Sequence, residues 1–97
     1  MGRFELFIPA SGSLKDKRRV IRAVTDAVRN HCNVAISEVG HQDLWQRAAL
    51  GVSCVAASSS RCEQVLQQVE KTVTRAAVDG AEIVDRSYAF VAMEDLI

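Results

Sequence analysis

Basic side chains recur at helical spacing between Ser13 and Arg29, and they are the groups in this chain best suited to bind a ligand. At about 100° per residue, five cations share one face of a helix drawn through this segment: Lys15, Arg18, Arg19, Arg22 and Arg29. Cations one turn apart can contact successive phosphates, and Arg does so with bidentate geometry. This face is therefore a candidate nucleic-acid-binding surface. The sequence leaves open a solvated face on which Asp26 pairs with its basic neighbours.

Lys17 differs from these cations because it falls within the apolar stripe of the same helix. We expect its aliphatic stem to pack against the core while its ammonium reaches toward the loop before the helix. Its candidate partners are the carboxylates of Glu38 and Asp43.

A polar cluster is expected at the tip of a hairpin, where Glu38, His41 and Asp43 follow one another closely. These residue types suit a metal ion or acid/base chemistry. Ordinary loop polarity explains them equally well, and no nucleophile or second base lies at a telling spacing. We predict no catalytic residues, metal or cofactor. An enzyme that uses this cluster is the least favoured of the functional hypotheses.

Trp45 and Arg47 are predicted to be same-face neighbours two residues apart on a strand. They could stack a nucleic-acid base, as the sheet of an RRM domain does, or an aromatic ring of a protein partner. The sequence lacks the RRM signature. Self-association through this face is therefore the favoured interpretation.

Six regular elements are expected to position these groups. The first three are a strand over 3–8, a helix from the capping residues Ser13 and Asp16 to about Asn30, and a strand over 33–39 that ends at a Gly40 turn. The next three are a strand over 44–57, a helix that starts in a capping box over 60–63 and ends at 79–80, and a strand over 82–93 kinked near 86–87.

The order strand, helix, strand, strand, helix, strand is typical of the α+β ferredoxin-like split βαβ sandwich, with two helices on one face of a four-stranded antiparallel sheet. Residues 1–97 then form a single domain. The other sheet face stays bare, and we expect it to carry Phe7, Trp45, Arg47, Val55, Tyr88 and Phe90. That is more apolar surface than a monomer usually exposes, so a homo-oligomer is expected.

Composition excludes several classes of protein. The 97 residues carry no net charge, but residues 1–50 hold eight Lys/Arg against five Asp/Glu, and residues 51–97 hold four against seven. A local basic patch fits this balance better than a strongly basic nucleic-acid binder. Three cysteines without Cys-x-x-Cys spacing disfavour a disulfide framework or a zinc site. With neither a signal peptide nor a membrane span evident, we expect a cytoplasmic protein without membrane partners.

Three segments, 13–20, 33–39 and 42–52, resemble the YlxP-like family of small bacterial proteins. The resemblance covers nearly the whole chain. It implies a ferredoxin-like fold, a cytoplasmic location and genes near those of transcription and translation factors, without established catalytic residues. The chain departs from the family pattern at its start, where a few residues of the first strand are missing, and over 88–97.

Together these observations favour a non-enzymatic module that binds RNA or a ribonucleoprotein such as the ribosome. The basic helix would supply phosphate contacts and the hairpin specificity. The alternative is a homodimeric protein-interaction or scaffold module that uses the open sheet face.

Overall fold

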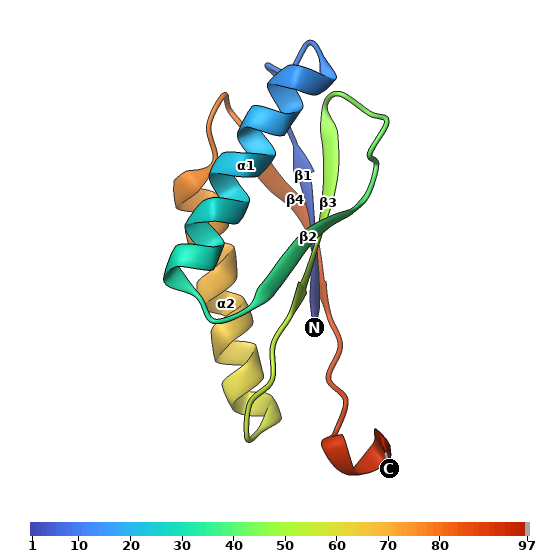
Figure 1. The fold of residues 1–97 in the computed structure, drawn as a ribbon, viewed down its shortest axis with the longest axis vertical. Helices are drawn as coiled ribbons and strands as arrows, with labels where there is room; N and C mark the ends of the chain where they lie inside the picture. The colour runs from blue at the N-terminus through green and yellow to red at the C-terminus, as the bar shows by residue number, and fades with distance from the viewer. Residues whose placement is uncertain (97) are drawn as a thin grey trace.

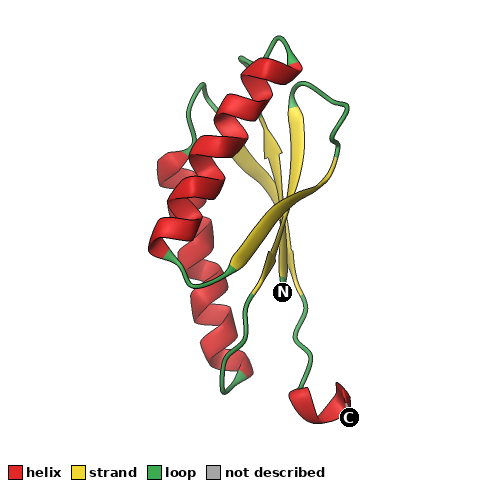
Figure 2. Cartoon of the chain, in the orientation of Figure 1, coloured by secondary structure: helices red, strands yellow, loops and turns green. Residues whose placement is uncertain are grey.

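The computed structural model describes residues 1–96, which form a four-stranded antiparallel sheet with two helices on one of its faces (Figures 1 and 2). The elements in chain order are β1 (Gly2–Phe7), α1 (Leu14–His31), β2 (Ala35–Gly40), β3 (Arg47–Ser53), α2 (Ser59–Ala76), β4 (Glu82–Tyr88) and the short 3-10 helix η1 (Met93–Leu96). The strand order is β2-β3-β1-β4. The predicted α+β ferredoxin-like fold is confirmed.

The core lies between the sheet and the helices because alternate strand residues point to opposite faces. Phe4 and Leu6 of β1 are fully buried beneath the helices, whereas Arg3 and Glu5 between them face the open side. The helices contribute fully buried residues at the spacing of one face: Val20, Val24, Val28, Leu66, Val69 and Val73. These apolar contacts hold both helices against the sheet.

Both helices start at serine caps. The Asp16 N–H donates to Ser13 Oγ at 3.1 Å, as the sequence predicts for the first helix. In α2 the cap is Ser58, whose Oγ accepts from the Arg61 N–H at 3.2 Å. The expected capping box starting at Ser60 is therefore wrong. Three consecutive serines offer competing caps, and tertiary packing selects among them.

The hairpin strand is shorter than expected because a turn occupies its predicted beginning. His41 adopts φ 57°, and its carbonyl accepts from the Leu44 N–H at 3.0 Å. Gly40, expected to make the turn, instead pairs with Ala49 as the last residue of β2. Trp45 therefore lies in the loop before β3, which corrects its expected place on a strand.

The last strand also differs from the prediction. β4 ends at Tyr88, and the chain then runs on to η1. Its irregularity is a bulge at Val84, since Glu5 pairs with Asp85 while Leu6 pairs with Ile83. The expected kink near 86–87 is therefore wrong.

Candidate functional site

The basic face of α1 divides into paired and free cations. Arg19 forms an ion pair with Asp79, which follows α2. Arg29 Nη2 donates to the Ile36 carbonyl of β2 at 3.1 Å, and its Nη1 lies 3.8 Å from Asp26. The remaining three are exposed and form no ion pair with any carboxylate in the part of the chain described: Lys15, Arg18 and Arg22.

Lys17 is buried, with 2% of its surface exposed. Its Nζ donates to the His41 carbonyl at 2.6 Å and lies 2.8 Å from Glu38 Oε2. The expected partner Glu38 is thus correct. The ammonium reaches the β2–β3 hairpin rather than the loop before the helix, because the apolar stripe of α1 faces β2 there. This contact ties the hairpin to α1.

A groove of about 570 Å³ runs between α1 and the edge strand β2. Arg18, Arg22 and Arg29 line it from the helix, Glu38 from the strand, and Gln42 from the hairpin. Its two carboxylates already have cationic neighbours, since Asp26 lies near Arg29 and Glu38 contacts Lys17. The groove therefore presents net positive charge to a ligand.

Side chains cover the outer edge of β2. Arg29 caps the Ile36 carbonyl, and Gln42 Nε2 lies 3.5 Å from the Glu38 carbonyl. Capped carbonyls are poor partners for an added strand. The groove thus favours a ligand that is recognised by cationic side chains over a peptide that extends the sheet.

The predicted cluster at the hairpin does not form. Glu38 faces Lys17 beneath α1, whereas His41 Nε2 lies 3.1 Å from Glu5 Oε1 on the open face. Asp43 is exposed. Within residues 1–96 as described, no three His, Cys, Asp or Glu side chains are grouped to hold a metal ion.

Glu5 is the centre of a polar set on the open face. His41 and then Arg3, whose Nη2 lies 3.2 Å from Glu5 Oε1, hold the pKa of this carboxyl below its usual value through their hydrogen bonds. Arg3 therefore offsets the charge of Glu5 within this set.

The predicted aromatic set of the open face is only partly correct. Arg47 lies over the Phe7 ring, 5.8 Å from its centroid. Trp45 is 54% exposed in the β2–β3 loop, which extends away from the helix layer (Figure 1). Val55 follows β3 and is exposed, as is Phe90 beyond β4.

Tyr88 corrects the prediction most directly, because it lies on the helix side of the sheet. It packs edge-on against Phe4, with ring centroids 6.0 Å apart, and its hydroxyl donates to Glu70 of α2 at 3.3 Å. Burial, followed by the Glu70 carboxylate, raises the pKa of this phenol. The bulge at Val84 adds a residue to β4, which shifts the alternation that places Tyr88.

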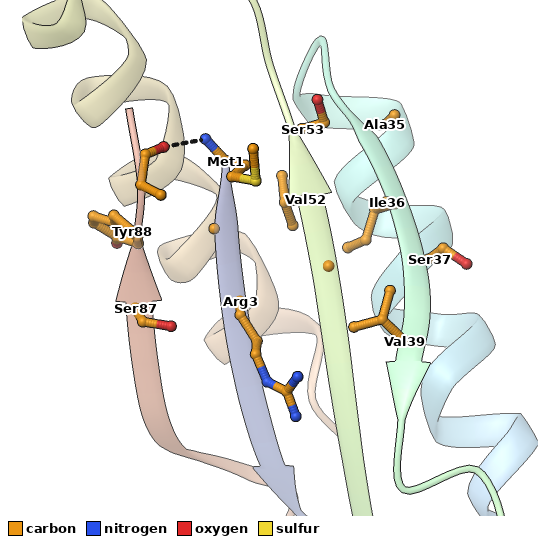
Figure 3. A pocket seen from close by; sticks show the side chains of 13 residues that line it. Met1, Arg3, Ala35, Ile36, Ser37, Val39, Val52, Ser53, Ser87 and Tyr88 are labelled. Atoms are coloured by element: carbon orange, nitrogen blue, oxygen red, sulfur yellow. Dashed lines mark hydrogen bonds between the residues drawn. The ribbon is translucent and has the colours of Figure 1, made fainter. Parts of the chain in front are cut away.

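Sequence reasoning missed a shallow apolar hollow of about 670 Å³ at one end of the open face. Its lining comes from all four strands or their ends, and Figure 3 shows short side chains at Ala35, Ser37, Ser53 and Ser87. Val39 closes it over Gly51, where an added Cβ would lie 2.8 Å from Val39 Cγ1. Small residues at alternate strand positions were the signal that could have revealed it.

The three cysteines are free and half-buried. Burial and then the neighbouring Cys62 raise the pKa of the Cys54 thiol, which lowers its reactivity at neutral pH. Among the described residues, no helix has both the length and the apolar character needed to cross a membrane.

Comparison with known proteins gives two matches. The family described as "Protein of unknown function (DUF503)" matches residues 1–88. The "Uncharacterized protein YlxP" of Bacillus subtilis (strain 168) is 41% identical over 81 residues, with coverage of 73% of this chain and 88% of the relative.

Proposed function

The chain belongs to the DUF503 family, and we propose that it is a non-enzymatic cytoplasmic protein that binds RNA through the groove between α1 and β2. One observation carries the proposal. Lys15, Arg18 and Arg22 are exposed on or beside this groove without a carboxylate partner in the described residues. Unpaired cations one helical turn apart are suited to successive phosphates of a nucleic-acid backbone.

The charge of the molecule is concentrated on this helix. α1 carries six Lys/Arg and two Asp/Glu, a net charge of +4 within a chain of zero net charge. The rest of the molecule is therefore acidic. A polyanion is attracted to one side of such a protein and repelled from the others, which orients it before contact.

Buried and hydrogen-bonded groups support the groove from behind. Lys17 is held in place by Glu38 and the His41 carbonyl, and the contact of Arg29 with the Ile36 carbonyl fixes one guanidinium at the rim of the groove. Side chains that are already held in place lose less conformational entropy when a ligand binds. Arg18 and Arg22 then supply the contacts that form only with RNA.

The hairpin beside the groove is the part suited to specificity. Gln42 lines the groove, and Asp43 is exposed next to it in the chain. An amide and a carboxylate can read base edges, whereas the cations contact the backbone alike in every sequence. A structured RNA, such as that of the ribosome, would offer both kinds of contact.

The test is fluorescence anisotropy with a labelled single-stranded RNA over a series of salt concentrations. Three phosphate contacts predict a slope of about −2 for log K against log salt. Replacing Lys15, Arg18 and Arg22 together with Gln, which keeps helix propensity similar, should weaken binding and flatten the slope.

The matched control replaces Arg61, Lys71 and Arg75 of α2 with Gln, since these exposed residues remove the same charge from the other helix. This control should bind RNA nearly as well as the unmodified chain. Equal losses in both triple variants, or no binding tighter than millimolar at low salt, would overturn the proposal.

A further inference from the structure

We propose that the open sheet face is the interface of a two-fold symmetric dimer, in which the aromatic end of each copy covers the apolar hollow of the other. The aromatic end consists of Phe7 with Arg47 over its ring and of exposed Trp45 in the adjoining β2–β3 loop, and the hollow is the one shown in Figure 3. This interface is independent of RNA binding, because the groove lies on the other side of the sheet.

Exposed apolar side chains concentrate on this side of the molecule. Met1 and Val39 line the hollow, and Leu44 and Trp45 lie in the β2–β3 loop at the opposite end; each of these four residues is more than 36% exposed. Val55 and Phe90 lie away from this face, since they border hollows at the ends of the helices. Such a concentration marks a surface that another molecule covers.

The shape of the face is self-complementary. The hollow lies at the start of β1, near Met1. The aromatic end lies at the other end of β1, where Phe7 pairs with Arg47 of β3. Consider two copies whose open faces meet, with a two-fold axis between them. The axis runs perpendicular to the strands and passes Phe4, so the strands of the two copies run in opposite directions. It therefore places Phe7 of one copy opposite Met1 of the other, and each aromatic end over a hollow.

The charged side chains of the two copies are also complementary under this two-fold symmetry. Arg3 is the residue before Phe4 in β1, and Glu5 is the residue after it. Glu5 pairs with Asp85 of the neighbouring strand β4. The axis places Arg3 of each copy opposite the Glu5 and Asp85 carboxylates of the other. Within one copy, Glu5 already contacts Arg3 and His41. Covering charges that have partners of opposite sign costs much less than covering isolated charges.

Charge also favours a second copy over RNA on this face. The strand residues at its open positions include Arg3 and Arg47 against Glu5, Glu82 and Asp85. This net negative surface would repel phosphates. Trp45 and Arg47 are thus better suited to a protein than to stacking a base.

The β2–β3 loop has to take part in the dimer interface, because the sheet face alone is too small. Four strands about 4.8 Å apart and six residues long cover a plan area of about 400 Å², whereas a stable interface buries about 800 Å² per partner. Leu44 and Trp45, 48% and 54% exposed in the β2–β3 loop, are placed to extend it. Trp45 is therefore the residue whose removal should matter most.

The chain has one tryptophan, so its fluorescence reports the state of this face. We expect sedimentation equilibrium to show a dimer, and the Trp45 emission to shift to shorter wavelength as concentration rises. Replacing Ala35, an exposed residue of the hollow, with Arg should abolish both signals. Trp45→Ala should weaken the dimer by about 30-fold or more, the loss typical of an aromatic hot spot.

Mixing the two variants tests the symmetry. In a mixed dimer one aromatic end still meets an intact hollow, so Trp45→Ala mixed with Ala35→Arg should associate more tightly than either variant alone. Thr74→Arg adds the same charge to the exposed helix surface and should leave the dimer intact. A chain that stays monomeric through the micromolar range, or a dimer insensitive to both variants, would overturn the proposal.

Discussion

The two faces of the sheet are built from the same strands but differ in what occupies alternate positions. On the covered face, Phe4 and Leu6 of β1 are fully buried. On the open face, Arg3 and Glu5 of the same strand stay in contact with solvent and with each other. The covered face therefore holds the fold together, while the open face is available for a partner.

The same contrast applies to charge. Lys15, Arg18 and Arg22 of α1 form no ion pair among the described residues, whereas Arg3 and His41 on the open face both contact Glu5. Unpaired charge favours a charged ligand, and paired charge permits burial. The molecule thus presents two surfaces of different chemistry.

The largest effect should come from the covered face. Leu66→Ala removes a fully buried side chain from α2, so we expect a loss of about 2–5 kcal/mol of unfolding free energy in urea. Val39→Ala, on the open face and 53% exposed, should cost less than about 1 kcal/mol at monomer concentrations. Similar losses for both variants would contradict the difference between the faces.

A somewhat smaller loss is expected for Lys17→Met. It leaves Glu38 Oε2 without its cation, and a buried pair that loses one partner typically costs about 3–5 kcal/mol. Because a quarter of the Glu38 side chain is exposed, we expect about 2–3 kcal/mol by urea denaturation. Combining Lys17→Met with Glu38→Gln should recover part of the lost unfolding free energy. A double variant less stable than Lys17→Met would contradict a stabilising contact between Lys17 and Glu38.

Single substitutions on α1 should separate paired from free cations. Arg22→Gln removes an unpaired charge and should weaken RNA binding by up to about fivefold, or 1 kcal/mol. Arg19→Gln should weaken it less, since Arg19 is paired with Asp79. Anisotropy titrations at low salt measure both, and a larger loss for Arg19→Gln would show that the free cations are misassigned.

The smallest effect should be a dependence on pH. Because the pKa of folded Glu5 lies below its usual value of 4.5, its ionised form stabilises the fold at neutral pH. That contribution should disappear as pH falls through the depressed pKa. Urea midpoints of Glu5→Gln should therefore lie slightly below those of the unmodified chain at pH 7 and converge with them in acid.

The exposed Glu82 of the same face supplies the control for this measurement. Glu82→Gln should follow the unmodified chain at both pH values. If Glu5→Gln did so as well, the hydrogen bonds from His41 and Arg3 would contribute nothing to stability.

Much of the fold was predictable because its signals are local. The order of the elements, the Ser13 cap and the apolar stripe of α1 all follow from spacing within a few residues. Even the pairing of Lys17 with Glu38 could be anticipated, since a lysine within an apolar stripe has few acceptors within reach. Apart from this pairing, these features do not depend on how distant segments meet.

The candidate sites were predicted less well because they depend on distant contacts. Spacing along α1 groups Arg19 with its basic neighbours, but Asp79, 60 residues away, neutralises it. Glu38 and His41 are close in sequence, yet β2 ends between them and their side chains lie on opposite faces of the sheet. Neighbours in sequence need not share a site.

The sequence by itself determined the two helices, the Ser13 cap, the buried stripes and the order of the elements in the split βαβ fold, because backbone geometry and apolar periodicity act over one or two turns. Only the tertiary structure decided which cations stay free, which side of the sheet Tyr88 occupies, and where the hollow lies. The bulge at Val84 and the turn at His41 change the alternation that sequence patterns assume, and ion pairs form across the chain once the helices dock on the sheet.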